Sequence, residues 1–287
     1  MILKAYPKST LQSFAIVGLV FVAMGIFYPL QTTLNESIGL SPSFLIYYIL
    51  SMGAPLLLIH FLKKKEEGTV SYLFKPCDLG VVSLLIVGTL ALQWGVTSPI
   101  GNSIPMPDNF KELFREMAEQ MNDGYGLISV AIMAPFFEEF IFRGVMLDGL
   151  LKRKSAWKAI LISAALFGLV HLNPWQFVTA MIIGTFAGWV YSRTRSLIYC
   201  MIIHFANNFT ASVFIYFNDD AAAMDMELHE MYGGQTNMYI IIAVSIVVAA
   251  VSISTLNKRM VMEHEPIEPE KSRDPENLDV FNGEQAN

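Results

Sequence analysis

Two adjacent carboxylates and an arginine lie within a long apolar stretch of the sequence. The segment EEFIFR contains Glu138, Glu139 and Arg143, and it falls inside an apolar run over residues 125–147. Ionisable side chains are costly in hydrocarbon, so where they occur in a membrane span they usually face a protein interior or a watery cavity. This run therefore predicts a buried chemical site rather than a simple membrane anchor.

Helical geometry gives the two glutamates different surroundings. Arg143 follows Glu139 by four residues and lies nearly above it on a helix, whereas Glu138 is rotated by about 140° from Arg143. Glu139 and Arg143 are thus predicted to form an ion pair. Glu138 is left without a local cation and is available as a general base toward water. The alternative is an ion network that only holds spans together, or an ion pathway lined by the same residues.

Two further polar motifs lie on apolar segments closer to the C-terminus. FGLVH places Phe167 and His171 one turn apart, and HFANN does the same for His204 and Asn208 on another segment. A lone histidine near a helix end is more often a satisfied interfacial residue than a catalyst, and paired polar groups can simply join helices by hydrogen bonds. They could equally donate to a developing oxyanion. The helical rise of about 1.5 Å per residue puts these polar groups and Glu138 in one slab of the membrane.

The composition assigns the chain to a lipid bilayer. Hydrophobic residues make up 54% of the chain and charged residues 15%, with a mean hydropathy of +0.47. A soluble domain of this length is far less apolar. Two cysteines, Cys77 and Cys200, are too few for a disulfide framework. The net charge of −6 is concentrated in the C-terminal tail and two loops, so it predicts no affinity for nucleic acid.

Apolar segments long enough to cross about 30 Å of hydrocarbon predict an all-α, polytopic transmembrane helical bundle of about eight spans. The predicted spans are 11–30, 43–62, 80–99, 125–147, 157–172, 175–192, 196–217 and 238–256. The fifth and sixth are predicted to form a tight hairpin around Asn173-Pro174. Gly184 and Gly188 form a G-x-x-x-G pattern in the sixth, which is predicted to let another helix of the same bundle approach closely.

The distribution of basic residues predicts the orientation. One side of the predicted bundle carries fourteen Lys and Arg residues, and the other side carries only Lys111 and Arg115. The fourteen are Lys4, Lys8, Lys63, Lys64, Lys65, Lys75, Lys152, Arg153, Lys154, Lys158, Arg193, Arg195, Lys258 and Arg259. Both termini are therefore predicted to be cytoplasmic. The compact size and short loops favour a bacterial cell membrane.

The predicted domains are a transmembrane domain at 1–257, with its motif core at 125–217, and a disordered acidic cytoplasmic tail at 258–287. Outside the spans, residues 107–121 carry apolar side chains at helical spacing. These are Phe110, Phe114, Met117 and Met121. The segment is predicted to be an amphipathic helix, either lying at the outer membrane interface or packed on the bundle as an ordinary connector.

EEFIFR, FGLVH and HFANN, in this order within spans, resemble the three motifs of the CPBP family of intramembrane proteases, the CAAX-protease and bacteriocin-processing type. Its best-known members cleave the tail of prenylated proteins. The resemblance covers roughly residues 125–217 and implies a glutamate-type endopeptidase that attacks a peptide bond with water. By this resemblance Glu138 activates the water, His171 positions or polarises it, and His204 with Asn208 forms the oxyanion hole.

The same resemblance implies supporting roles for Glu139, Arg143 and Phe167. One glutamate and two histidines would satisfy a three-ligand zinc site, but His171 and His204 lie on different spans and no H-E-x-x-H helix is present. The sequence therefore favours a site with no metal or other cofactor, with zinc as the alternative. The implied partners are membrane lipid and a peptide or protein substrate, such as a lipidated protein or a leader peptide.

Two other classes of function fit the same polar residues. A proton-coupled transporter would use Glu138, Glu139 and the histidines as a relay, although the inverted repeats common in transporters are not visible. A catalytically silent binding or immunity protein would keep the polar pocket to hold a partner. As a third possibility, Cys200 lies one turn before His204 and is an alternative nucleophile, but a buried thiol without electropositive neighbours is usually inert.

Overall fold

A computed structural model of the chain describes residues 4–72, 74, 77–119, 123–217 and 226–260. These ranges are helical throughout their regular structure and contain no strand. In chain order the elements are α1 (Thr10–Ile38), α2 (Leu40–Glu67), α3 (Leu79–Leu92), η1 (Gln93–Thr97), α4 (Ser98–Asn102), α5 (Asp108–Glu119), α6 (Gly124–Leu127), η2 (Ile128–Met133), α7 (Ala134–Glu139), η3 (Phe140–Leu147), α8 (Asp148–Leu151), α9 (Ala156–Leu169), α10 (Pro174–Thr194), α11 (Leu197–Phe217), α13 (Leu228–Met231) and α14 (Gln235–Arg259). Elements marked η are π-helical.

Each predicted span coincides with a helix or a run of joined helical segments. Six stretches are long and apolar enough to cross a membrane: Thr10–Ile38, Leu40–Glu67, Leu79–Asn102, Gly124–Leu151, Leu197–Phe217 and Gln235–Arg259. The protein is therefore a multi-pass membrane protein. With 14 residues, α9 is short for a crossing of about 30 Å, and α10 is long enough but less hydrophobic than the six. The count of eight stays a prediction, and most of the predicted tail at 258–287 lies outside the described residues.

The first two helices form a long hairpin, which corrects the gap of twelve residues between the predicted spans 11–30 and 43–62. Helix α1 continues to Ile38 and α2 begins at Leu40, so only Gly39 separates them. Gly39 has a φ of 87°, a conformation that glycine adopts without a steric penalty. Most of the polar side chains at residues 31–37 are exposed on the last turns of α1. Their polarity ends the apolar span but does not end the helix.

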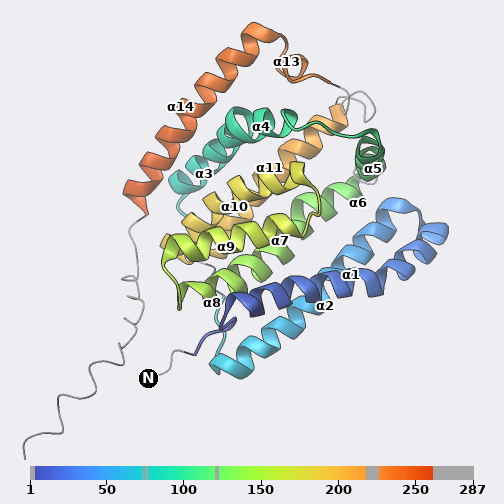
Figure 1. Cartoon of the computed structure of the whole chain (residues 1–287), viewed down its shortest axis with the longest axis vertical. Helices are drawn as coiled ribbons and strands as arrows, with labels where there is room; N and C mark the ends of the chain where they lie inside the picture. The colour runs from blue at the N-terminus through green and yellow to red at the C-terminus, as the bar shows by residue number, and fades with distance from the viewer. Residues whose placement is uncertain (1–3, 73, 75–76, 120–122, 218–225, 261–287) are drawn as a thin grey trace, which may run out of the picture.

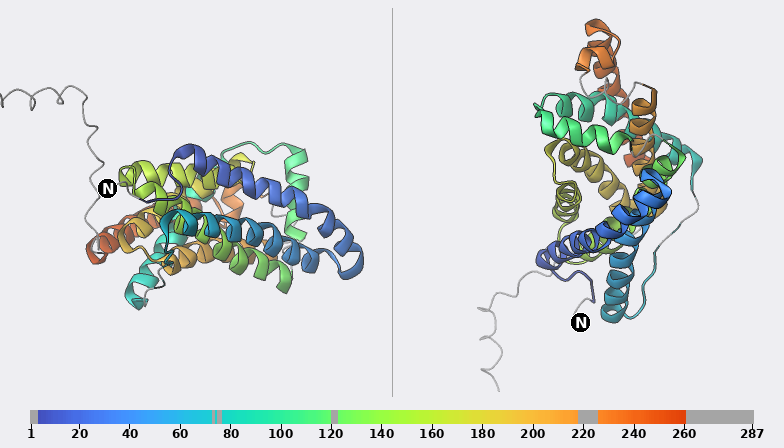
Figure 2. Two further views of the ribbon diagram at one scale, coloured as in Figure 1. Left: turned by 90° about the horizontal axis from the view of Figure 1, so that it is seen from below. Right: turned by 90° about the vertical axis from the view of Figure 1, so that its right-hand side faces the viewer.

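The run Gly124–Leu151, called here the motif helix, lies at the centre of the bundle. It is the most deeply buried of the six candidate spans. The α1–α2 hairpin covers one side of it, α9 and α10 pack together next to it, and α11 separates it from α3 and α14 (Figure 1). Figure 2 shows the same order from two other directions. Charges on the motif helix are consequently held inside protein rather than facing lipid.

The predicted α9–α10 hairpin and its glycine pattern are both present. Asn173 caps α10, and its side chain accepts a hydrogen bond from the Gln176 N–H. A Cβ atom at Gly184 would lie 3.1 Å from Arg143 Nη2, and one at Gly188 would lie 3.1 Å from an Ile160 methyl group. The glycines therefore admit side chains from the motif helix and α9 within one bundle, as the sequence predicted.

The predicted amphipathic segment forms α5, although Met121 lies outside the described residues. The rings of Phe110 and Phe114 pack against Trp175 at the start of α10, with centroid separations of 5.2 and 6.0 Å. Trp175 also donates a hydrogen bond to the Ile104 carbonyl at 3.0 Å. These contacts favour the connector packed on the bundle. A position at the membrane interface stays a prediction.

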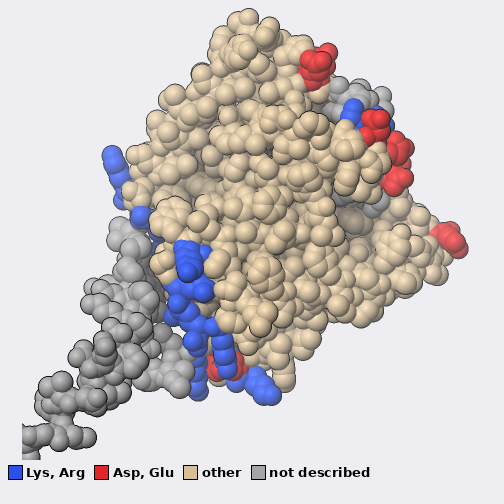
Figure 3. Space-filling model, viewed as in Figure 1, with Lys and Arg blue, Asp and Glu red and all other residues tan. Residues whose placement is uncertain are grey.

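Charged side chains divide between the two ends of the bundle. On the face drawn in Figure 3, Lys and Arg gather at the end near the N-terminal segment, while most Asp and Glu lie at the opposite end. Basic residues occupy the last turns of α2, α10 and α14. This separation is the asymmetry on which the predicted orientation depends.

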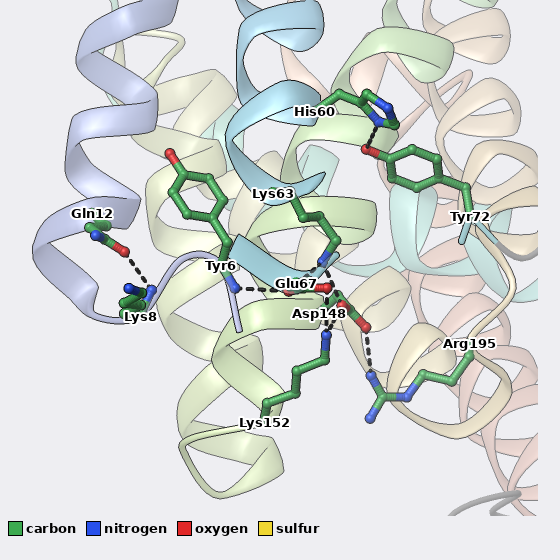
Figure 4. A network of polar contacts seen from close by, with 10 residues as sticks. All are labelled: Tyr6, Lys8, Gln12, His60, Lys63, Glu67, Tyr72, Asp148, Lys152 and Arg195. Carbon is green, nitrogen blue, oxygen red and sulfur yellow. Dashed lines mark hydrogen bonds and ion pairs between the residues drawn. The ribbon is translucent and has the colours of Figure 1, made fainter. Parts of the chain in front are cut away.

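A cluster of ion pairs joins several segments at the basic end (Figure 4). Lys63 is 2% exposed, and its Nζ lies 2.8 Å from Asp148 and 3.2 Å from Glu67. Lys152 contacts the same two carboxylates at 3.0 and 3.1 Å, and Arg195 contacts Asp148 at 3.1 Å. Burial lowers the pKa of Lys152, but Asp148 and Glu67 together raise that pKa above its ordinary value. This basic-end cluster fixes α2 and the turn before α11 to the end of the motif helix.

Adjacent glutamates allow the contribution of this cluster to be measured. Replacing Glu67 with alanine should lower the free energy of unfolding by about 3 kcal/mol, because the buried Lys63 and the partly buried Lys152 lose a shared carboxylate. Glu66→Ala is the matched control. Glu66 is 34% exposed and its partner Lys8 is 46% exposed. Glu66→Ala should therefore lower the free energy of unfolding by less than about 1 kcal/mol. The measurement is thermal or denaturant unfolding of the detergent-solubilised variants. An equal loss of unfolding free energy in both variants would contradict a stabilising role for the basic-end cluster.

Candidate functional site

The ion pair predicted within EEFIFR is confirmed. Arg143 Nη1 donates to Glu139 Oε1 at 2.7 Å, and both side chains are 1% exposed. Arg143 Nη2 donates to the Gly184 carbonyl at 3.2 Å, and the guanidinium lies 4.6 Å from the centre of the Phe167 ring. Helix α10 and Phe167 on α9 thus hold the arginine in place. Arg143 is committed to Glu139 and to the packing of three helices.

Glu138 lies apart from this pair, with different partners. Its Oε1 accepts a hydrogen bond from the Tyr48 hydroxyl on α2, and its Oε2 lies 3.7 Å from His204 Nε2 on α11. The side chain is 12% exposed. Within the described part of the chain, no lysine or arginine pairs with Glu138. The sequence predicted this separation from the cation.

Sequence reasoning did not identify Tyr48. Its ring packs at 6.0 Å from Phe44 on the same helix, and its hydroxyl reaches across to the motif helix. A buried tyrosine hydroxyl usually needs a hydrogen-bond partner, so a tyrosine in the second apolar span was a usable signal. The partner itself lies 90 residues away in the chain, and only the packing of α2 against α7 reveals it.

His204 connects the two glutamates. Its Nδ1 lies 2.9 Å from Glu139 Oε1, while its Nε2 faces Glu138. The contact with the Glu139 carboxylate fixes the orientation of the imidazole ring. The side chain is 9% exposed. The second nitrogen is therefore directed toward Glu138.

His171 is near the cluster but is not bonded to the glutamates. Its Nδ1 lies 3.0 Å from the Phe167 carbonyl oxygen, one turn earlier. The Phe167 ring stands edge to face with both imidazoles, 5.4 Å from His171 and 5.5 Å from His204. Among the described residues no hydrogen bond or ion pair links His171 to Glu138 or Glu139. Phe167 thus packs against both histidines.

Asn208 is fixed by a break in the motif helix. In the π-helical segment η2, the Ala134 N–H bonds to the Ser129 carbonyl, five residues earlier. The next carbonyl, that of Val130, would need the N–H of Pro135, and proline has none. Asn208 Nδ2 donates to this carbonyl at 2.9 Å. A proline in the motif helix therefore explains how the amide on α11 is held beside it.

Asn207, which precedes Asn208 in HFANN, supports the same amide. Its Nδ2 donates to Asn208 Oδ1 at 3.1 Å. The Asn208 side-chain oxygen accepts from Asn207, and one of its two N–H groups donates to the Val130 carbonyl. The second N–H of the amide is left to donate to a ligand. Its orientation is therefore fixed from both sides.

The donor set does not form a metal site. Within the described ranges, no three His, Cys, Asp or Glu side chains converge as a bound metal requires. Glu139 is bonded to Arg143, and His171 turns Nδ1 toward its own helix. These residues do not fit the zinc alternative, and we derive no step through a metal.

The part of the chain that carries these polar residues matches a known protein family. Residues 122–210 match the family model of the type II CAAX prenyl endopeptidases, Rce1-like. This match supports membership of the CPBP family. The matched region runs from the start of the motif helix into α11 and contains all three motifs of the CPBP resemblance. The matched family model describes prenyl endopeptidases, which implies peptidase activity toward a peptide or protein in the membrane. No curated protein and no solved structure matched the chain in the corresponding comparisons.

Proposed function

We propose that the protein is an intramembrane endopeptidase that hydrolyses a peptide bond near the bilayer by direct attack of water. The observation that carries the proposal is the different environment of two adjacent glutamates. Glu139 is neutralised by Arg143, whereas Glu138 has no basic partner from lysine or arginine in the described chain and faces His204. A carboxylate in a protein interior, with no bound cation, is suited to act as a base.

Glu138 takes a proton from water as the water oxygen attacks the carbonyl carbon of the substrate. Tyr48 holds one carboxylate oxygen, which leaves Oε2, on the side of His204, to accept this proton. The tetrahedral intermediate then collapses as the bond between carbon and nitrogen breaks. Glu138 returns the proton to the departing amine, so the carboxylate is regenerated.

The negative charge that develops on the carbonyl oxygen requires hydrogen-bond donors held in position. We assign this role to His204 and Asn208, one turn apart on α11. Glu139 fixes the His204 ring, and Val130 with Asn207 fixes the Asn208 amide. Donors fixed before the reaction stabilise such a charge strongly in a site with little water. His171, packed on Phe167, would position the water through its second ring nitrogen.

Tyr48 positions the base in this mechanism. Tyr48→Phe should lower kcat about tenfold with KM changed less than twofold, because hydrogen bonds to a charged group contribute about 1.5–3 kcal/mol and the carboxylate loses its fixed orientation. The neighbouring Tyr47 provides a matched control, since among the described residues its hydroxyl bonds to neither glutamate. Tyr47→Phe should leave both constants unchanged. Equal kcat values for wild type and Tyr48→Phe would exclude the positioning role.

The Cys200 alternative lacks a suitable geometry. The thiol is fully buried and contacts the carbonyl oxygens of Ala187 and Ser196, at 3.5 and 3.6 Å. Both nitrogens of His204 face glutamates instead. A thiol needs an adjacent base to become a nucleophile. The structure therefore favours attack by water over attack by Cys200.

The experiment that tests the function compares cells that carry the wild-type protein with cells that carry Glu138→Ala. Mass spectrometry of membrane and secreted peptides should show an uncleaved peptide that accumulates only in the variant, and the cut site in wild type identifies the substrate. A lipidated protein tail or a leader peptide is the expected class. Full biological activity of Glu138→Ala would instead support the silent binding protein, and ion flux in proteoliposomes would support the transporter.

The charge distribution supports a proposal for the orientation of the protein in the membrane. We propose that the basic end, which holds the last turns of α2, α10 and α14, faces the cytoplasm of a bacterial cell. Both termini then lie on the cytoplasmic side, because basic loops are retained there.

A further inference from the structure

A cavity of about 240 Å³ lies beyond the candidate site, between η1, α4 and the outer half of α11. Its walls include Gln93 and Trp94 from η1, and Thr210, Ala211 and Ile215 from α11. Segments of π-helix are rare and occur frequently at functional sites. The π-helical segment η1 lines this cavity, which makes the cavity a candidate functional site.

The cavity continues the face of α11 that carries the candidate site. His204, Asn208, Ala211 and Ile215 follow one another at i, i+4, i+7 and i+11, which is one stripe of a helix. At about 1.5 Å per residue, Ala211 lies about 10 Å beyond His204 along the helix axis. A polypeptide bound at His204 and Asn208 would reach the cavity within a few residues.

Two buried acceptors lie beside this path. Gln93 Oε1 and Asn207 Oδ1 are inaccessible to solvent and have no hydrogen-bond partner. Asn207 does not itself line the cavity but lies one turn before Ala211, which does. A buried polar atom without a partner carries a free-energy cost, so most such atoms in proteins have one. Both atoms accept hydrogen bonds, and a peptide backbone supplies N–H donors.

A larger apolar cavity provides a route from the lipid. It has a volume of about 470 Å³, lies between α3 and α14, and shares Trp94 and Met231 with the smaller cavity. Two of its lining residues, Val87 and Val244, are 44% and 55% exposed, so it is open on the outer surface of the bundle. Helices α3 and α14 stand side by side there (Figure 1). A segment embedded in the membrane can therefore approach the smaller cavity sideways.

We propose that the smaller cavity is the subsite that binds the substrate polypeptide beside the bond that is cut. An extended segment would donate backbone N–H groups to Gln93 and Asn207 and place an apolar side chain against Trp94 and Phe214. The bound ligand is thus a peptide segment rich in apolar residues. This inference rests on the proposed peptidase function and adds Gln93 as a residue that binds substrate without taking part in the chemistry.

The test uses the full-length protein in detergent and a quenched fluorescent peptide built on the cut site found with Glu138→Ala. Gln93→Leu removes the unpaired acceptor and should raise KM about 5- to 10-fold, the effect of one hydrogen bond, with kcat within twofold. Ala211→Trp fills the cavity and should raise KM further. Phe209→Trp adds bulk to the same helix at a position that is 39% exposed, and it should change neither constant.

A second measurement separates binding from structure. Because Gln93 Oε1 has no partner, Gln93→Leu should not lower the thermal unfolding temperature. Unchanged KM in both cavity variants would mean that water occupies the cavity, and a fall in kcat alone would mean that Gln93 supports the chemistry; either result overturns the proposal. A wild-type protein that leaves the peptide uncut would instead refute the peptidase function, and the subsite with it.

Discussion

Glu138→Gln is expected to reduce kcat by about 10²- to 10⁴-fold, the range attributed to general base catalysis. Glutamine keeps the size of the side chain and an oxygen that can accept from Tyr48, but it cannot take a proton from water. KM should change little, because the substrate contacts assigned to Gln93 and Asn207 remain. The measurement is steady-state cleavage of the identified peptide by the purified variants.

A matched control for this substitution is Glu112→Gln, since Glu112 is 66% exposed and forms an exposed pair with Arg115 on α5. It should retain wild-type kcat. Turnover of Glu138→Gln within tenfold of wild type would refute Glu138 as the base. Addition of a metal chelator to wild type provides an independent result: unaltered turnover is expected for a base acting on free water, and loss of turnover that zinc restores would return the metal alternative.

Arg143→Met is expected to lower the free energy of unfolding by about 3–5 kcal/mol. The substitution removes the cation from Glu139, which is 1% exposed and already has one oxygen without a partner. Removing one member of a buried ion pair is strongly destabilising, because an uncompensated charge is left in the interior. The Gly184 carbonyl loses the guanidinium donor as well. Thermal unfolding and denaturant titration of the solubilised variants measure the loss.

Two variants separate the charge from the packing of the arginine. Arg193→Met is a control, since Arg193 also donates to a carbonyl and lies over an aromatic ring, at 5.3 Å from Trp189, but has no ion pair with a carboxylate among the described residues. It should cost about 1 kcal/mol. The double variant with Glu139→Gln and Arg143→Met should recover part of the loss, since no charge is left unpaired. If the double variant is less stable than the sum of its parts, the ion pair is not the cause.

Local features of the site were predictable because they depend on spacing along single helices. The Glu139–Arg143 pair follows from i, i+4 geometry, and the position of Glu138 on another side of the helix follows from the same rule. The α9–α10 hairpin follows from Asn173-Pro174. The long α1–α2 hairpin was missed, since polarity marks the end of a span but not the end of a helix.

Contacts between helices could not be obtained in this way. Nothing in the sequence relates Tyr48 to Glu138, and the resemblance alone does not show that His204 contacts Glu139 as well as facing Glu138. The Val130 carbonyl, left without a donor by Pro135, is bonded by Asn208 because α11 packs beside η2. The contact of Phe167 with His204, in addition to His171 one turn away, likewise depends on how α9 and α11 pack.

By itself, the sequence determined the membrane-embedded helical class, the family motifs and the separation of one carboxylate from its cation, because hydropathy and helical periodicity are properties of neighbouring residues. Only the tertiary structure decided which helices contribute partners to each carboxylate and where cavities remain. These depend on how side chains of different helices fill shared space, and residues far apart in the chain have no spacing rule that relates them.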